Sequence, residues 1–381
     1  MTSGATSRID AVDLARGVAL IGMMLVHLGP VWTGGHPPWG DVVAGGRAAP
    51  LFAMLAGVAL SLVHRRDPRG AGSVRATCIR AAVLIVLGLV LGSLDDMPVY
   101  VILAFYGLMI VVALPFRGLP TWVLGTLGVV WAVIAPLALL WLQIHHGPVI
   151  SEQASTADLL PPWSLVARLV VWGAYPALVW FAYVLVGLAV GRLDLTALRT
   201  SVSLVAAGAV MLVASLGIGW IAIAQGVFDD WAASGGAQSG WPLLVTRTPY
   251  PYDSASWREL WLVGEHTSRP LNVLSAIGSA LVVIGLCALV LRLTSVSRLL
   301  APLRAAGAMT LTLYTVHVLW TWRLDLEMAE MGYGSWLTQV VVLCGFALLW
   351  QRLVGRGPLE SAVRWLSVTA WSTRARDRIN T

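Results

Sequence analysis

The sequence has few charged residues for its length and no lysine at all. Charged side chains make up 12% of the 381 residues, all 25 basic residues are arginine, and 58% of the residues are hydrophobic. So little charge cannot solvate the surface of a soluble protein of this size. The composition therefore excludes a soluble globular fold and predicts an integral membrane protein.

Cysteine is scarce, and the common catalytic signatures are missing. Cys78, Cys287 and Cys344 all fall inside apolar runs without metal-ligand spacing. We therefore expect structural thiols, no disulfide framework and no bound metal. The chain also lacks a Walker-type glycine loop, HExxH, a CxxC pair, GxSxG and any repeat of 20 to 50 residues.

Long apolar runs are what the sequence has in abundance. A bilayer core of roughly 30 Å needs about 20 helical residues per span. We therefore predict an all-α, polytopic bundle of about ten transmembrane helices. The predicted spans are 13–33, 47–64, 75–94, 98–116, 119–143, 164–190, 199–226, 270–293, 303–322 and 335–354.

The arginines predict the orientation of this bundle. If the N-terminus is cytoplasmic, 19 of the 25 arginines fall on the cytoplasmic side, as the positive-inside rule requires. Both termini are then cytoplasmic, and topology accounts for the net charge of +6 without a nucleic-acid partner. The six outer arginines are Arg47, Arg168, Arg247, Arg258, Arg269 and Arg323.

The predicted spans and loops give one domain with a tail. Residues 1–354 form the domain, in which 227–269 is a long extracytoplasmic loop and 270–354 are the C-terminal helices. The loop is rich in Trp, Tyr, Pro and Gly, so we expect it to fold onto the bundle as a lid, with a short interfacial helix at 254–263. The tail, 355–381, predicts an amphipathic helix on the inner leaflet.

A charged cluster, "RIDAVDLARG", begins the first span. Asp13 and Arg16 are three residues apart and share a helix face. They form either a charge pair that stabilises the helix start or, together with Arg8, a site for the anionic phosphates of a cytoplasmic cofactor, which guanidinium groups suit.

A second candidate lies in the loop "GGHPPWGDVV", on the predicted outer side. His36 can act as a general base, because the pKa of histidine lies close to neutral pH. Asp41 is near enough in sequence to orient its imidazole. Taken alone, the pattern fits an ordinary loop histidine equally well.

These two stretches together resemble the start of the catalytic domain of heparan-α-glucosaminide N-acetyltransferase and its bacterial relatives. The later segments "LAFYGLMIV", "VLVGLAVGRLDL", "GAMTLTLYTVHVL" and "GRGPLE" resemble a related bacterial membrane family without assigned function. Residues 1–226 are the most similar part. The residues that carry the resemblance are Asp13, Arg16, Gly17, His36, Trp39, Pro50 and Phe52.

The resemblance implies a transmembrane acyltransferase of the bacterial cytoplasmic membrane. It would take an acetyl or short acyl group from cytoplasmic acetyl-CoA, or another acyl-CoA, to a hydroxyl or amine of an extracytoplasmic saccharide or small molecule. His36 would be catalytic with Asp41, and Arg8, Asp13 and Arg16 would bind the cofactor. The chain departs from the eukaryotic pattern at Pro37, Pro38, Gly40 and Asp41, and Gly46 stands where an Asp is usual.

Further ionisable and aromatic residues are expected around these sites. Tyr314 and His317 either line the acyl-CoA tunnel or form a buried hydrogen-bonded pair. His27, inside the first span, is a candidate for the tunnel or site. We expect the substrate-binding residues at the outer cavity to be Trp39, Arg47, Asp95, Asp96, Glu265 and His266.

A different function remains open. A transporter or flippase of an amphipathic metabolite or lipid-linked envelope precursor would use a similar helix bundle. The sequence shows no clear pair of broken helices at matched positions, which mildly disfavours it. We expect the lipid bilayer, the acyl-CoA and the acceptor as partners, no nucleic acid, and leave a homodimer open.

Overall fold

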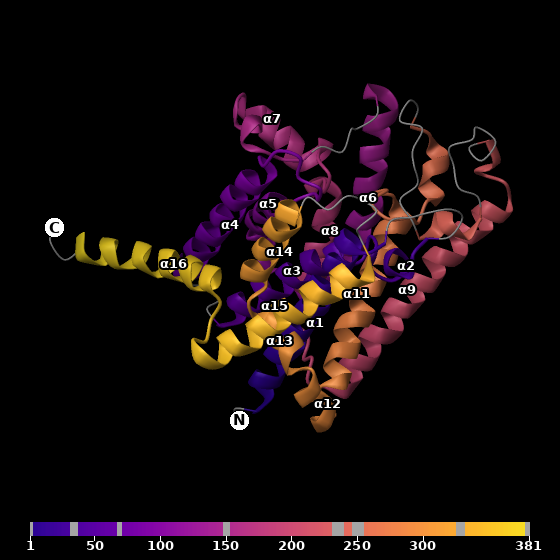
Figure 1. Cartoon of the computed structure of the whole chain (residues 1–381). Coiled ribbons are helices and arrows are strands. Elements are labelled where there is room, and N and C mark those ends of the chain that lie inside the picture. Colours follow the sequence, from indigo (N-terminus) through magenta and orange to yellow (C-terminus); the bar gives the residue numbers. More distant parts are fainter. Residues whose placement is uncertain are drawn as a thin grey trace.

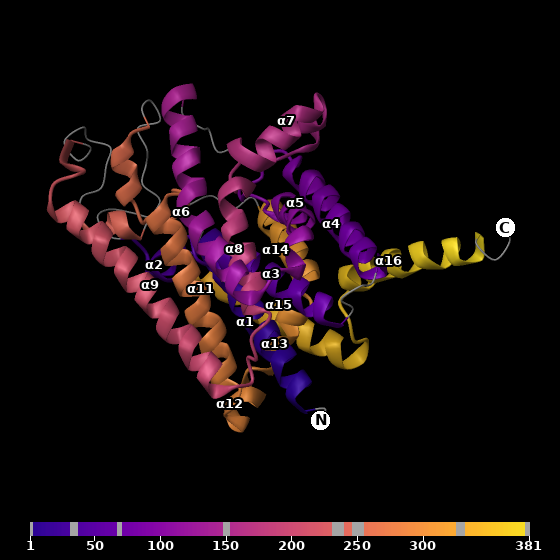
Figure 2. The same ribbon diagram turned by 180° about the vertical axis from the view of Figure 1, so that it is seen from behind.

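The fold is that of a helical membrane protein, as seen in a computed structural model. The structure describes residues 3–30, 37–66, 71–147, 153–230, 240–245, 255–324 and 332–377. Every regular element in these ranges is a helix or a helical turn. Figures 1 and 2 show the long helices crossing the molecule side by side.

Within the described residues, seven helical segments are long and apolar enough to cross a membrane. One of them joins two helices, α2 and α3, over Trp39–Arg65. The protein is therefore a multi-pass membrane protein. The helices are α1 (Ser3–Leu28), α2 (Trp39–Ala44), α3 (Ala48–Arg66), α4 (Ala71–Gly92), α6 (Thr121–His146), α9 (Leu198–Ala224), α11 (Pro270–Val290) and α15 (Tyr333–Leu353).

The other elements are shorter and complete the bundle. The helices are α5 (Leu103–Ala113), α7 (Pro162–Ala167), the π-helical turn η3 (Arg168–Trp172), α8 (Ala177–Val190), α12 (Thr294–Leu299), α13 (Ala301–Ala308), α14 (Thr310–Leu324) and α16 (Pro358–Asp377). The 3₁₀ turns are η1 (Pro115–Gly118), η2 (Thr156–Leu159), η4 (Trp241–Leu244) and η5 (Trp257–Trp261).

Three of the ten predicted spans are not continuous long helices. In 98–116 only α5 is α-helical, because Pro115 opens a 3₁₀ turn. The span 164–190 is interrupted between η3 and α8, where Pro176 caps α8. The span 303–322 breaks at Met309, whose backbone leaves the helical region. The apolar composition of these three spans is confirmed, whereas their prediction as continuous helices is wrong.

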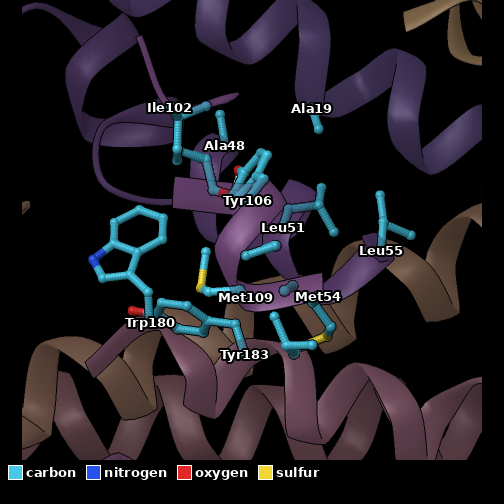
Figure 3. Close-up of a cluster of buried hydrophobic side chains, with 14 of the residues drawn as sticks. Ala19, Ala48, Leu51, Met54, Leu55, Ile102, Tyr106, Met109, Trp180 and Tyr183 are labelled. Carbon is cyan, nitrogen blue, oxygen red and sulfur yellow. Dashed lines mark hydrogen bonds between the residues drawn. The ribbon is translucent and has the colours of Figure 1, made fainter. Parts of the chain in front are cut away.

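The core is built where α3 packs against α8 and α5. A Cβ atom on Gly187 would lie 2.0 Å from the Met54 carbonyl oxygen, so the backbones of α8 and α3 touch there and leave no room for a side chain. Figure 3 shows Leu51 and Met54 of α3 beside Tyr106 of α5. The Tyr106 hydroxyl donates to the Ala49 carbonyl oxygen at 2.6 Å. This contact fixes α5 against α3.

The opposite flanks of the bundle are formed by different helices. The pair α9 and α11 lies along one flank, while α16 projects from the other (Figures 1 and 2). Its Glu360 carboxylate accepts hydrogen bonds from the backbone nitrogens of Leu311 and Thr312, at 2.8 and 3.2 Å. A carboxylate at a helix N-terminus is stabilising. The start of α16 is therefore bound to the start of α14.

The described part of the long loop 227–269 packs onto the bundle. Phe228, Leu243 and Leu262 form a small apolar cluster with Ala222 at the end of α9. The helix predicted at 254–263 is the 3₁₀ turn η5, and residue 254 lies outside the described residues. The loop is thereby held over one end of the bundle.

A buried ion pair anchors this loop to two helices. The Arg269 side chain is 2% exposed and the Glu259 side chain 0%. The Arg269 Nε donates to Glu259 Oε2 at 3.0 Å, and its Nη2 donates to Gln143 Oε1 of α6 at 2.6 Å. The pair therefore ties η5 to α6 and to the start of α11.

Candidate functional site

The structure contains a cavity of about 290 Å³ among α1, α3, α4, α5, α14 and α16. Its polar lining comes mainly from Arg16, Thr77, Arg80, Thr310 and Glu360, which belong to α1, α4, α14 and α16. The remaining lining is mostly apolar and includes Met23, Phe52, Leu55, Leu84, Ile102, Leu103, Tyr106, Leu311 and Tyr314. The cavity is thus polar at one end and apolar along its length.

Two arginines, from different helices, line the polar end. Arg16 of α1 pairs with Asp13, with Nη1 and Oδ1 3.2 Å apart. Arg80 of α4 has no hydrogen-bond or ion-pair partner within the described ranges, and its charge interacts with those of Arg16 and Glu360. Two cations on one cavity repel each other, and an anionic ligand would relieve that repulsion.

The predicted N-terminal cluster is therefore only partly at the cavity. Arg16 lines the cavity, whereas Asp13 does not line it and is joined to it only through its ion pair with Arg16. Arg8 lies in the first turns of α1, and its side chain is outside the described residues. Asp10, the other acid here, pairs instead with Arg304 of α13 at 2.8 Å.

Sequence reasoning missed Arg80 and Glu360 as residues of this cavity. Arg80 was counted only as a charge on the cytoplasmic side. Its place inside the apolar run "CIRAAVLIV" was the available signal, because a charged residue within a membrane helix is costly and usually functional. Glu360 gave no such signal, since it lies in the tail and reaches the cavity through tertiary packing.

Tyr314 and His317 occupy different surroundings one turn apart. Tyr314 lines the cavity, and its hydroxyl accepts a hydrogen bond from the Ile102 nitrogen at 3.3 Å. His317 is completely buried and does not line the cavity. Its Nε2 lies 2.8 Å from the Nδ1 of His27, and the two rings are stacked with centroids 5.1 Å apart. The buried-pair alternative therefore describes His317, although its partner is His27 and not Tyr314.

A second group of candidate residues meets where the long loop reaches the turn between α2 and α3. A Cβ atom on Gly46 would lie 2.6 Å from the Glu265 Cβ, so the two backbones are in close contact. The charge of Glu265 attracts that of Arg47. The His266 ring lies edge-on to Tyr175, with centroids 5.7 Å apart, and stacks on Trp180 at 6.4 Å. Arg47, Glu265 and His266 are therefore brought into one neighbourhood.

The remaining predicted residues do not all join this group. Trp39 is half exposed and stacks on Tyr333 of α15, with ring centroids 4.8 Å apart. Asp95 and Asp96 are exposed in the turn after α4, and the Asp95 carbonyl accepts a hydrogen bond from Trp322 at 2.9 Å. The Asp41 side chain makes no hydrogen bond with any described residue. His36, the leading catalytic candidate, lies outside the described residues.

The described residues also contain no group of three or more His, Cys, Asp or Glu side chains that could hold a metal ion. Fold and cavity together define a class: a multi-pass helical membrane protein with an internal apolar cavity that ends among arginines. The family described as "Heparan-alpha-glucosaminide N-acetyltransferase, catalytic" matches residues 8–219. The match covers more than half of the chain, so the protein belongs to this family, as the resemblance implied.

Membership of the family implies a transmembrane acetyltransferase-like function. The matched range begins within α1 and ends within α9, and it includes Arg16, Arg80 and most of the apolar cavity wall. A search of curated proteins found no match.

Proposed function

We propose that the protein transfers an acetyl or short acyl group from cytoplasmic acyl-CoA to a hydroxyl or amine of an extracytoplasmic saccharide or small molecule. The observation that carries this proposal is the cavity with Arg16 and Arg80 at its polar end. Guanidinium groups bind phosphates well, and an apolar channel suits the pantetheine arm and the acyl group. Arg8 joins the phosphate contacts in this proposal.

The polarity of the cavity agrees with the predicted orientation of the chain. Arg16 and Arg80 both fall on the side that holds most of the arginines, which is the cytoplasmic side under the positive-inside rule. Tyr314 lies farther along the cavity wall. An acyl-CoA that enters from the cytoplasm would therefore hold its phosphates at the arginines and direct its thioester towards Tyr314.

The acceptor side of the proposal uses the loop residues. His36 is the general base or transient acyl acceptor, and Asp41 orients it. His266, Glu265 and Arg47 bind the acceptor from one neighbourhood, and Trp39, Asp95 and Asp96 are further contacts. The reaction breaks the C–S bond of the thioester and forms a C–N or C–O bond.

Binding of acetyl-CoA to the purified protein in detergent tests the donor half of this proposal. Calorimetry should detect binding to the wild type, and bound ligand should raise the unfolding midpoint. Arg80→Gln removes charge-assisted hydrogen bonds worth about 1.5–3 kcal/mol, so acetyl-CoA affinity should fall roughly ten- to hundredfold. Arg199→Gln, at an exposed arginine of α9 outside the cavity, is the matched control and should leave affinity unchanged.

The alternative proposal is a transporter or flippase of an amphipathic metabolite or lipid-linked precursor. The broken helices at Pro176 and Met309 favour it, since transporters often build their sites at such breaks. A wild type that binds no acyl-CoA in calorimetry would reject the acyltransferase. Uptake or flipping of an amphipathic substrate by reconstituted vesicles would then support the alternative.

A further inference from the structure

Two intramembrane histidines and a glutamine form a hydrogen-bonded chain beyond the cavity. His27 of α1 contacts His317 of α14 through Nδ1 and Nε2, 2.8 Å apart. The other nitrogen of His317, Nδ1, bonds to Oε1 of Gln339 on α15. Helix α1 and the consecutive helices α14 and α15 therefore supply one chain of polar groups inside an apolar bundle.

The ends of this chain differ in their access to solvent. His317 is completely buried and Gln339 is 1% exposed, whereas His27 retains accessible surface. The Gln339 Nε2 is also buried and has no hydrogen-bond partner among the described residues. The chain is thus fully buried at Gln339 and only partly buried at His27.

Two arrangements of protons are compatible with the contacts between His27, His317 and Gln339. In one, Nδ1–H of His317 donates to Gln339 Oε1 and Nδ1–H of His27 donates to His317 Nε2, so His27 Nε2 is a free base. In the other, the Gln339 amide is rotated and its Nε2 donates to His317 Nδ1. His317 Nε2–H then donates to His27 Nδ1, and His27 Nε2 carries a proton. Passing from the first arrangement to the second adds a proton at His27 Nε2 and requires one to leave His317 Nδ1. The Gln339 amide cannot take that proton, so the contact between His317 Nδ1 and Gln339 Oε1 holds the first arrangement.

The pair lies between the cavity and the outer group of residues. His27 follows the cavity residue Met23 by four positions on α1, and His317 follows Tyr314 by three on α14. At 1.5 Å per helical residue, these steps advance about 6 and 4.5 Å along the two axes. On the outer side, His266 lies close enough to His27 for their charges to interact.

The proposed reaction releases a proton on the outer side. The acceptor amine or hydroxyl loses it when the new C–N or C–O bond forms, and a base on that side must take it up. The departing CoA sulfur, in the inner cavity, takes a proton from the cytoplasmic solvent when its C–S bond breaks. No oxidant or reductant is involved, and the proton released by the acceptor balances the one that the thiolate takes up.

We propose that the His27–His317 pair, ended by Gln339, takes up the proton that the acceptor releases, directly or from His36, and returns it to the outer side. This inference rests on the proposed acyl transfer. With the proton of His317 on Nδ1, towards Gln339 Oε1, His317 Nε2 accepts from His27 and His27 Nε2 is the free base. His27 and His317 are therefore positioned as proton carriers, separate from the residues that bind the donor.

The variant His27→Gln tests the loss of proton transfer without a large change in packing. Gln keeps a polar group within reach of His317 but cannot gain and lose a proton at neutral pH. His27→Gln should lower release of CoA from acetyl-CoA in the presence of glucosamine by about 10²–10⁴-fold, the usual contribution of general acid–base groups. Acetyl-CoA affinity by calorimetry and the unfolding midpoint should stay within error. His145→Gln, at an exposed histidine of α6, is the matched control.

Rescue by added imidazole uses the unequal access of the two histidines. His27→Ala should recover CoA release when imidazole is added, because this site is only partly buried, and recovery should increase with the basicity of substituted imidazoles. His317→Ala should not recover, because its site is fully buried. Gln339→Met, which keeps the volume and removes the end of the chain, should lower CoA release less than His27→Gln does.

The outcomes distinguish this inference from the function on which it rests. If the wild type binds acetyl-CoA and releases CoA but His27→Gln and His317→Gln retain full turnover, the proton-carrier role is wrong and acyl transfer stands. Rescue of His27→Ala that is independent of imidazole basicity would show a packing role and would also overturn it. A wild type that neither binds nor turns over acetyl-CoA overturns both.

Discussion

The buried Glu259–Arg269 pair is predicted to hold the acceptor-side residues in place. Arg269 follows His266 by three positions and caps the start of α11. Glu259→Gln removes the carboxylate charge that faces the buried Arg269 guanidinium. Breaking one partner of a buried pair costs about 3–5 kcal/mol, more than an exposed pair of roughly 0–1 kcal/mol could cost.

Each partner of the pair makes a second contact, which increases the loss of stability expected from Glu259→Gln. The Glu259 carboxylate also accepts a hydrogen bond from the Ser256 nitrogen at 2.9 Å, which begins η5. Arg269 additionally holds Gln143 of α6. Losing the charge at Glu259 therefore loosens the loop from α6 and α11 together, and we expect the effect at the upper end of that range.

Thermal unfolding in detergent measures the stability change. Each kcal/mol corresponds to roughly 2 °C in a chain of this size, so Glu259→Gln should lower the midpoint by several degrees. A double variant, Glu259→Leu with Arg269→Met, removes both charges and should recover much of the loss, because an apolar replacement leaves no buried charge. Asp230→Asn, which breaks the exposed pair with Arg258, is the matched control and should change little.

Activity supplies the second measurement. In Glu259→Gln the turnover of acetyl-CoA with glucosamine should fall, while acetyl-CoA affinity should be unchanged because the cavity lies among other helices. An unchanged midpoint in the single variant, or a double variant less stable than the single, would refute the reasoning.

Two further predictions concern the catalytic loop and the core. His36→Ala should preserve acetyl-CoA affinity and abolish acyl transfer; turnover equal to that of the wild type would remove His36 from the mechanism. Gly187→Val should force α8 away from α3, because a Cβ there meets the Met54 carbonyl at 2.0 Å, and we expect a destabilisation of more than about 3 kcal/mol, as for severe overpacking. Its control, Gly125→Val on α6, has no atom within 4 Å of the added Cβ. Equal melting midpoints for the two glycine variants would contradict the close packing.

The fold class followed from composition, but the helix breaks did not. Apolar runs are visible in sequence because burial in lipid requires them. The run 303–322 is uniformly apolar enough to predict a single helix, yet it breaks at Met309. Beside this break, a Cβ atom on Gly307 would lie 1.6 Å from the Asp13 carbonyl oxygen of α1. Such a break is decided by contact with a distant helix, which no local pattern contains.

The candidate site was predictable where single residues are unusual for their surroundings. Arg16 and His27 are ionisable groups in apolar segments, and both were recognised for that reason. The partner of His27 was not, because His317 is 290 positions away and its neighbour Tyr314 offered a closer partner in sequence. Pairing between helices depends on their rotation and crossing, which only the assembled bundle fixes.

The size of the cavity and the position of the histidine pair bear on the choice between acyl transfer and transport. A transporter must pass its whole substrate between the two sides, whereas a transferase needs to pass only the acyl group. The cavity of about 290 Å³ is at the lower end of the sizes found for ligand pockets. His27 and His317 lie on the cavity helices α1 and α14, about one turn beyond Met23 and Tyr314, and His27 is close enough to His266 for their charges to interact. A whole substrate that passed along these two helices would have to displace a buried, hydrogen-bonded pair, while the proposed base needs that pair intact. The arrangement therefore favours transfer, and the opposite responses expected of His27→Ala provide the decisive comparison: removing the His27 ring should impair a transferase and should widen the path of a transporter.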